Sequence, residues 1–391
     1  MKKVIVGKKI ITPFGLINGY LEIEDGKITK VKEGNFEHHE DVEAIDAGEN
    51  YVSPGFIDIH THGGGGHDFM DGSVECILKA SEKHLEHGTT TIVPTTLTST
   101  QDELFKTIDN FKKAKINLKY GPYLHGLHLE GPYFSQEQRG AQDPRFIKDP
   151  DSNEYKKIIE YANGAVARWT VAVELDGALE MGYYLKENGI VASIGHSNAE
   201  YFRVAEAVRH GYSLLTHFYS GMSSIVRKGG FRHLGVIESG YLLDELDIEI
   251  IADGCHLPTE LLQMICKLKD NNHIALVTDS MRGAGMPDGE SILGSLKNGQ
   301  PVIIEDGVAK LMDRSAFAGS VATTDRLVRV MHKNAKLDIC SAVKMMTENP
   351  AKIMKIDNRK GSIASGKDAD IVIFDEDINI QKVIFAGEVV Y

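Results

Sequence analysis

Histidines and carboxylates recur along this chain where short apolar segments end. In chain order they are His60, His62, Glu130, His196, His217, His256 and Asp279. One carboxylate with two imidazoles is a typical ligand set for a hydrolytic zinc ion, because it leaves a coordination position for water. Glu130, His196 and His217 could form such a set, so these residue types indicate metal-dependent hydrolysis.

His60 and His62 close the first of these apolar segments and are separated by Thr61. Residues i and i+2 of a strand point to the same face, so both imidazoles would look into one pocket. The pair therefore predicts a second metal site. The alternative is that only the glutamate and histidine set binds an ion, and that this pair lines the pocket.

Asp279 and His256 also follow apolar segments. Hydrolysis of an amide needs a base that accepts a proton from water and returns it to the leaving nitrogen, and a carboxylate beside a metal suits this task. We therefore expect Asp279 to be the general base and acid, the alternative being a turn-forming residue before Ser280. His256 is expected to bind substrate hydroxyls or phosphate, with a pocket-wall role as the alternative.

Eight apolar segments read as strands that could position these side chains. They cover residues 55–60, 89–95, 123–130, 169–175, 190–196, 213–218, 247–253 and 273–279. Helical patterns lie between several of them and end at a glycine, the usual residue after a helix C-terminus. Alternating strands and helices of this length predict a (β/α)8 barrel of the TIM type. In such a barrel the carboxyl ends of all strands meet at one rim, so the candidate residues would converge there.

Both ends of the chain are rich in short strands and turns. Residues 1–54 and 361–391 are expected to form one small β-sandwich domain, and residues 55–360 the barrel domain. The turn at residues 24–27 separates two alternating segments, which predicts a hairpin. Residues 290–313 interrupt the barrel pattern and read as a hairpin insertion after the eighth strand.

The amino-acid composition limits the kinds of partner and the cellular location that suit this chain. The chain has 391 residues, 42% of them hydrophobic and 25% charged, with a formal net charge of −13. This acidic balance argues against nucleic acid as a partner. No segment approaches the length of a membrane span, no signal peptide is evident, and four cysteines without a CxxC pair favour a cytoplasmic location. His38, His39 and His87 read as surface residues.

Several motifs together resemble one family. They are PGFIDIHTHG, HGTTTIVPT, GLHLEGPYF, RGAQ, IGHSNA, THFYSGM, IIADGCH, LVTDSMRGAGMPDGE and FAGS. These motifs are similar to those of N-acetylglucosamine-6-phosphate deacetylases in the amidohydrolase superfamily, and the resemblance spans nearly the whole chain. The first motif indicates only the superfamily, whereas HLEGP, GHSNA and ADGxH are more specific to the deacetylases.

The resemblance implies roles for individual residues. It implies metal ligands at Glu130, His196 and His217, a general base and acid at Asp279, and substrate contacts at His256 and at Ala318 of FAGS. Gln142 falls where some members carry a histidine that polarises the acetyl carbonyl, and its amide could donate the same hydrogen bond. Members that retain His60 and His62 resemble the two-metal type. Zinc is the first expectation for the divalent ion, and iron, manganese or cobalt would suit the same ligands.

Two departures from the family pattern concern the phosphate. Ser220 and Gly221 stand where the family typically has Asn-Ala, and their backbone amides could still bind phosphate. The loop that follows is longer than usual, so Arg227 and Arg232 compete for the role of the phosphate arginine. Family members are usually homodimers in which an arginine reaches across the interface. The substrate expected from the resemblance is a small amino-sugar phosphate.

Three alternatives remain open at this point. The first is the same reaction on another N-acetylated amino-sugar phosphate, such as the galactosamine epimer. The second is another amidohydrolase reaction on an amide, and the third is a homologue without catalytic activity. The second is disfavoured because no lysine stands at a matching strand end.

Overall fold

The computed structural model describes residues 2–37 and 42–391, so His38 and His39 lie outside the described residues. Its larger part is a nearly closed sheet of parallel strands. The strands are β6 (Phe56–Thr61), β9 (Thr89–Thr96), β10 (Tyr123–Leu124), β11 (Leu127–Glu130), β12 (Val166–Val171), β13 (Val191–Ile194), β14 (Tyr212–Leu215), β17 (Asp247–Ile250) and β18 (Ile274–Leu276). The predicted barrel fold is confirmed.

Backbone hydrogen bonds close the barrel between its last and first strands. The amide of Asp279 donates to the carbonyl of His60 at 2.8 Å, and the amide of His62 donates to the carbonyl of Ser280 at 2.8 Å. The closure therefore passes directly through three of the candidate site residues. Their relative positions are fixed by the backbone as well as by side-chain contacts.

The strands from the third to the eighth are shorter than the expected segments, and two of them differ further. The third position is split into β10 and β11 around Gly126, where an added Cβ would lie 2.6 Å from the Cβ of Ala167. This close approach requires glycine and interrupts the strand. The fourth strand runs over Val166–Val171 rather than 169–175, because the chain already turns towards the next helix after Val171.

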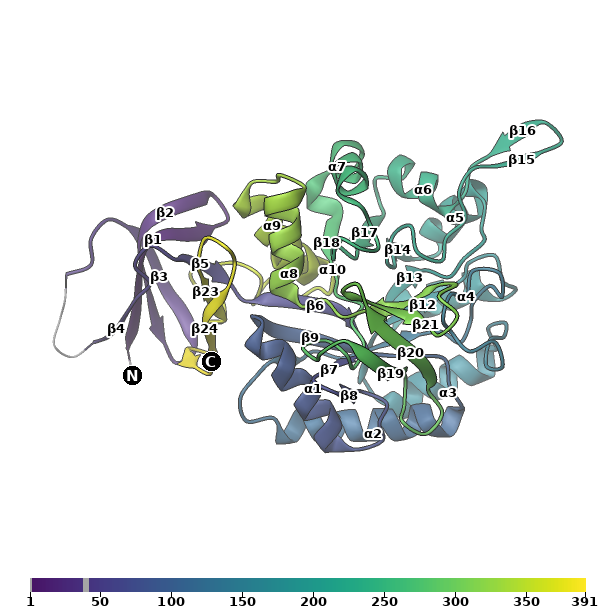
Figure 1. Cartoon of the computed structure of the whole chain (residues 1–391), viewed down its shortest axis with the longest axis horizontal. Helices are drawn as coiled ribbons and strands as arrows, with labels where there is room; N and C mark the ends of the chain where they lie inside the picture. Colours follow the sequence, from purple (N-terminus) through teal and green to yellow (C-terminus); the bar gives the residue numbers. More distant parts are fainter. Residues whose placement is uncertain (1, 38–41) are drawn as a thin grey trace.

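Helices surround the barrel (Figure 1). They are α1 (Val74–Glu86), α2 (Gln101–Asn117), α3 (Ser152–Ala162), α4 (Ala178–Glu187), α5 (Tyr201–Arg209), α6 (Val236–Leu242), α7 (Thr259–Leu268), α8 (Thr324–Arg329), α9 (Ile339–Met346) and α10 (Glu348–Ile353), with a short 3-10 helix η1 (Asn271–His273) and a π-helical segment η2 (Val330–Asn334). The structure adds α2, α6 and α7 to the helices expected from the sequence. Side chains of Ser73, Thr100 and Asp151 accept hydrogen bonds at the starts of α1, α2 and α3, as helix N-caps do.

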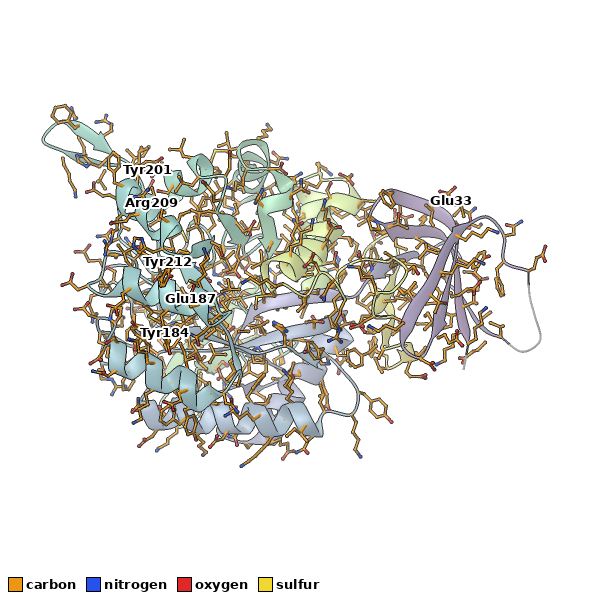
Figure 2. The ribbon with its side chains drawn as sticks, turned by 180° about the vertical axis from the view of Figure 1, so that it is seen from behind. Glu33, Tyr184, Glu187, Tyr201, Arg209 and Tyr212 are labelled. Carbon is orange, nitrogen blue, oxygen red and sulfur yellow. The ribbon has the colours of Figure 1, made fainter. Side chains whose placement is uncertain are left out.

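A separate, mostly antiparallel sheet is built from both ends of the chain. It contains β1 (Lys3–Thr12), β2 (Gly15–Glu24), β3 (Lys27–Glu33), β4 (Glu43–Asp46), β5 (Tyr51–Pro54), β23 (Ile371–Phe374), β24 (Ile380–Phe385) and β25 (Glu388–Val389). Asp25 and Gly26 have φ of 49° and 72°, so the expected hairpin between β2 and β3 is confirmed. Figure 2 shows Glu33 on this domain, away from the barrel helices that carry Tyr184 and Tyr201.

Two hairpin regions extend from the barrel. The flap consists of β19 (Gly289–Leu293), β20 (Gln300–Glu305), β21 (Val308–Leu311) and β22 (Phe317–Ser320), and it lies where the insertion was expected. The arm consists of β15 (Val226–Lys228) and β16 (Phe231–His233) and projects from the body in both views (Figures 1 and 2). β7 (Gly63–Gly64) and β8 (His67–Asp68) form a small hairpin after β6.

Among the described residues, no helix has the length and apolar character to cross a membrane.

Candidate metal centre and active site

The structure brings six of the predicted side chains together at the rim of the barrel. They form two groups in which the possible ligand atoms lie within 4.8 Å of one another. One group is His60, His62 and Asp279, and the other is Glu130, His196 and His217; all six are buried. His60 and His62 lie at the end of the first strand, β6, and each of the other four lies at or just after the end of a different strand. They converge because the carboxyl ends of all barrel strands meet at one rim.

Glu130 links the two groups. Its Oε1 lies 3.0 Å from Nε2 of His196 and 3.1 Å from Nε2 of His217. Its Oε2 lies 3.2 Å from Nε2 of His62. One carboxylate therefore faces imidazole nitrogens of both groups, which is the arrangement expected of a ligand shared between two adjacent cations.

Asp279 completes the first group. Its Oδ1 lies 3.1 Å from Nε2 of His62 and 3.4 Å from Nε2 of His60. The residue has a φ of 46°, and His196 and His217 have φ of 48° and 34°. Positive φ at non-glycine residues is strained and is concentrated at functional sites. The strand ends thus turn sharply at three of the candidate residues.

Charge in this cluster is balanced between histidines and carboxylates. Burial by itself lowers the pKa of His60, but Asp279 and Glu130 outweigh it and raise that pKa to about 9. Burial also lowers the pKa of His62, and hydrogen bonds to the same carboxylates raise it to about 10. Without a cation, both imidazoles are therefore protonated at neutral pH. Because a metal needs neutral imidazole ligands, protons and metal ions compete for this site.

The donor set fits a divalent cation. Nε2 of His60 is buried and has no hydrogen-bond partner among the residues that the structure describes. The Nε2 atoms of His196 and His217 lie 3.1 Å apart, near the separation of about 3.4 Å between ligands in a tetrahedral site. Nδ1 of His196 lies 2.9 Å from the carbonyl of Gln138, a contact that would direct its Nε2 lone pair towards the cluster.

A cavity of about 220 Å³ opens above these ligands. His62, Glu130, His196, His217 and Asp279 lie at its base, and Gln142, Ser220, Gly221 and His256 lie around it. Leu293 and Phe317 of the flap form its outer wall, and the Phe317 ring lies 4.8 Å from the His256 ring. Nδ1 of His256 is paired with Asp253 at 2.8 Å, which fixes the orientation of the imidazole.

The amide of Gln142 has a defined orientation. Its Oε1 accepts a hydrogen bond from the backbone amide of Thr98 at 2.9 Å, and its Nε2 donates to Oε2 of Glu130 at 2.8 Å. The NH₂ group therefore faces the ligand cluster. Because an amide nitrogen carries two hydrogens, one donor remains for a bound molecule.

Three predicted substrate contacts lie elsewhere in this chain. Ala318 was expected near the substrate, but its side chain is fully buried in the apolar cluster of the flap. The reason is strand alternation: Phe317 and Gly319 line the cavity, and the residue between them points to the opposite face. Arg227 and Arg232 occupy opposite positions on the two strands of the exposed arm, and neither lines the cavity.

Some cavity residues had no clear signal in the sequence. Leu293 belongs to the flap, which reads only as an insertion until its strands are placed over the barrel rim. Phe317 lies in the FAGS motif, but the resemblance implies a substrate contact at Ala318 and not at Phe317. Gly140 and Ala141 were within reach of prediction, since they precede Gln142 in the RGAQ motif.

Gly221 is a site residue whose departure from the family pattern has a structural reason. Its φ is 57°, and an added Cβ would lie 2.9 Å from the carbonyl oxygen of Gln138 and 3.0 Å from Nδ1 of His196. These are the two atoms of the contact that orients the His196 imidazole. An alanine here would therefore push directly on a candidate metal ligand.

We expect Gly221→Ala to destabilise the fold and to weaken metal binding. Gly48→Ala is the matched control, because Gly48 has a φ of 58° and no atom within 4 Å of an added Cβ. Both variants should lose about 1–2 kcal/mol from the left-handed backbone, and only Gly221→Ala should lose a further ~1–3 kcal/mol from overpacking. Denaturant unfolding and metal titration measure the two effects. Equal losses in the two variants, with unchanged metal affinity, would contradict this interpretation.

The model of the amidohydrolase family matches residues 51–390. The chain belongs to the amidohydrolase family. This amidohydrolase is 33% identical to the N-acetylglucosamine-6-phosphate deacetylase of Bacillus subtilis, over 96% of the chain and 93% of that protein. It is also 27% identical to an N-acetylgalactosamine-6-phosphate deacetylase of Escherichia coli O157:H7, over 99% of each chain.

Solved structures agree with the sequence comparison. The N-acetyl-D-glucosamine-6-phosphate deacetylase of Mycobacterium smegmatis, a mutant solved in complex with N-acetyl-D-glucosamine-6-phosphate, superposes on this amidohydrolase with a TM-score of 0.90. The two are 28% identical, and the match covers 99% of each chain. The similarity to this group of deacetylases that the motifs indicate is confirmed.

Proposed function

We propose that this amidohydrolase removes the acetyl group from N-acetylglucosamine 6-phosphate, giving acetate and glucosamine 6-phosphate. The observation that carries the proposal is the convergence of two ligand groups and the Gln142 amide on one cavity. Similarity over nearly the whole chain to deacetylases of this substrate supports the same reaction.

Glu130, His196 and His217 would hold one divalent cation, and His60, His62 and Asp279 a second. A bound cation supplies Lewis-acid activation of water and of the acetyl carbonyl. Zinc suits these ligands, as do iron, manganese and cobalt, and availability often decides among them. The metal is therefore proposed as divalent, with zinc as the first candidate.

Asp279 is the proposed general base and acid. Burial raises its pKa, but the neighbouring His60 and His62 outweigh that effect and lower the pKa below its ordinary value. The group is therefore a carboxylate at neutral pH. It would accept a proton from the attacking water and deliver it to the amine nitrogen as the carbon–nitrogen bond breaks.

Gln142 is the proposed donor to the acetyl carbonyl, and its removal should slow the chemical step. We expect Gln142→Ala to lower kcat by about 10²–10³-fold, the usual effect of removing one donor to a developing oxyanion. Gln142→His, which restores a donor, should recover part of the rate. Metal content must be measured in both, because Nε2 of Gln142 also contacts Glu130. Full kcat in metal-loaded Gln142→Ala would exclude this role.

The phosphate is proposed to bind near His256, Ser220 and Gly221, which lie around the cavity. The arm carries Arg227 and Arg232, and Phe231 on it is 77% exposed. A two-stranded hairpin is marginally stable alone, so an exposed apolar arm favours a covering partner. We infer a homodimer in which the arm of one copy brings an arginine to the phosphate in the other.

A second candidate substrate is N-acetylgalactosamine 6-phosphate. The departure at Ser220 and Gly221 motivates it, and one similar deacetylase is named for that epimer.

A cytoplasmic location is part of the proposal, because all four cysteines are free thiols, which suits a reducing compartment.

Acetate release from four compounds tests the substrate assignment: the two phosphorylated epimers and their unphosphorylated counterparts. We expect the highest kcat/KM on N-acetylglucosamine 6-phosphate and a large loss without phosphate. Preference for the galactosamine epimer would favour the second candidate. Equal turnover with and without phosphate would exclude phosphate recognition at Ser220 and Gly221.

A further inference from the structure

A buried ion pair lies inside the barrel beneath the candidate metal centre. Arg168 is on β12 and Glu249 on β17, and both are fully buried. Both terminal nitrogens of the guanidinium contact the carboxylate, one of them at 2.9 Å. The interior of such barrels is usually filled by branched apolar side chains. Since a buried pair is often no more stabilising than apolar residues of similar volume, its presence here calls for a further role.

Other strands hold Arg168 in one position. Its Nε donates to the hydroxyl of Ser193 at 2.8 Å, and one terminal nitrogen donates to the hydroxyl of Thr216 at 2.8 Å. The other terminal nitrogen donates to the carbonyl of Ile59 at 3.2 Å. The guanidinium is thus tied to four other strand segments of the barrel, and it fixes the Glu249 carboxylate in turn. We call these two residues the Arg168–Glu249 platform.

Glu249 contacts one candidate ligand from each metal group. Its Oε2 lies 3.5 Å from Nδ1 of His60, at the long end of the hydrogen-bond range. The same oxygen accepts a hydrogen bond from the backbone amide of His217 at 3.3 Å. His217 has a φ of 34°, so this bond holds a strained backbone in place.

The contact with His60 has a consequence for its tautomer. An Nδ1 that faces a carboxylate carries the proton, which leaves the Nε2 lone pair for a metal. Nε2 of His60 is the atom that faces Asp279 at 3.4 Å and has no hydrogen-bond partner in the described part of the chain. Glu249 therefore contacts Nδ1 of His60, the nitrogen that must carry the proton if Nε2 is to bind a metal.

We propose that the Arg168–Glu249 platform positions the ligands of the metal centre, because it sets the tautomer of His60 and fixes the backbone of His217. One carboxylate thereby holds a ligand of each metal group in place. The inference rests on the proposed metal site. Neither platform residue touches the substrate cavity, so both act through the ligands above them.

Paired variants test the platform without leaving an unpaired buried charge. Arg168→Met with Glu249→Leu removes the charges and the acceptor for His60. Arg168→Met with Glu249→Gln removes the same charges and keeps a side-chain oxygen. Metal affinity is measured by chelator competition, and the visible absorption of the cobalt-loaded protein reports the ligand geometry.

We expect the leucine variant to bind metal about 10- to 100-fold more weakly than the wild type, with an altered cobalt spectrum. The glutamine variant should recover part of the affinity. Wild-type affinity and spectrum in a folded leucine variant would overturn the proposal, as would equal losses in the two variants. Both measurements are made without substrate, so they are independent of whether the protein releases acetate.

A milder variant covers the case in which the paired variants do not fold. Thr216→Val removes the hydrogen bonds of this hydroxyl to Arg168 and to the Thr170 hydroxyl, and it leaves the ion pair intact. Its matched control is Thr91→Val, because Thr91 is a fully buried barrel threonine whose hydroxyl has no partner in the described chain. Weaker metal binding in Thr216→Val alone supports the platform, and equal affinity in the two variants overturns it.

Discussion

Asp279→Asn should lower kcat by about 10²–10⁴-fold, the range that a general acid or base contributes. The amide oxygen can still face His60 and His62, but it can neither accept the proton of water nor return it to the amine. The expected loss is therefore in kcat, with the cation at Glu130, His196 and His217 still bound. Steady-state kinetics on N-acetylglucosamine 6-phosphate, with metal content determined on the same sample, measures it.

Asp325→Asn is the matched control for this variant. Asp325 is also a buried aspartate, and burial raises its pKa, but a hydrogen bond with His87 outweighs that effect and lowers the pKa; Asp325 does not line the cavity. It should keep near-wild-type kcat. Full turnover in folded, metal-loaded Asp279→Asn would remove Asp279 from the mechanism.

Glu130→Ala should have the largest effect on metal binding. In the part of the chain that the structure describes, Glu130 is the one carboxylate that faces His62, His196 and His217 together, so its loss removes a candidate ligand from both groups. We expect metal affinity to fall by at least about 100-fold, consistent with the loss of a shared anionic ligand. Acetate release should fall below detection in the same preparation.

Thermal or denaturant unfolding gives an independent measure of this effect. A metal at 100 times its Kd stabilises the native state by about 2.7 kcal/mol. Adding a chelator should therefore destabilise the wild type and leave Glu130→Ala unchanged. Glu174→Ala is the control, because Glu174 follows another barrel strand but binds Ser197 and the amide of Asn198 instead of the cluster. Retained metal response in Glu130→Ala would contradict the shared-ligand assignment.

The sequence predicted the barrel and the convergence of its rim residues because both follow from local patterns. Each candidate residue directly follows a short apolar segment, and parallel strands place their carboxyl ends together. The turn at Asp25 and Gly26 was equally local. These features depend on neighbours within a few residues, which a single sequence contains.

Other features depend on contacts between distant segments. The family motif predicts a substrate contact at Ala318, but only the register of β22 on the flap decides that Phe317 faces the cavity. The split of the third strand depends on how closely Gly126 approaches Ala167. Arg168 and Glu249 are 81 positions apart, and nothing near either of them indicates that they pair beneath His60.

The most direct test of the proposed metal-dependent deacetylation is a stoichiometric assay of both products from N-acetylglucosamine 6-phosphate. Acetate and free amine would be measured with the protein as purified, after removal of metal by a chelator, and after a divalent ion is restored. We expect equal amounts of the two products, loss of both on chelation, and recovery with metal. No acetate from folded, metal-loaded protein, or undiminished release after the metal has been removed, would contradict it.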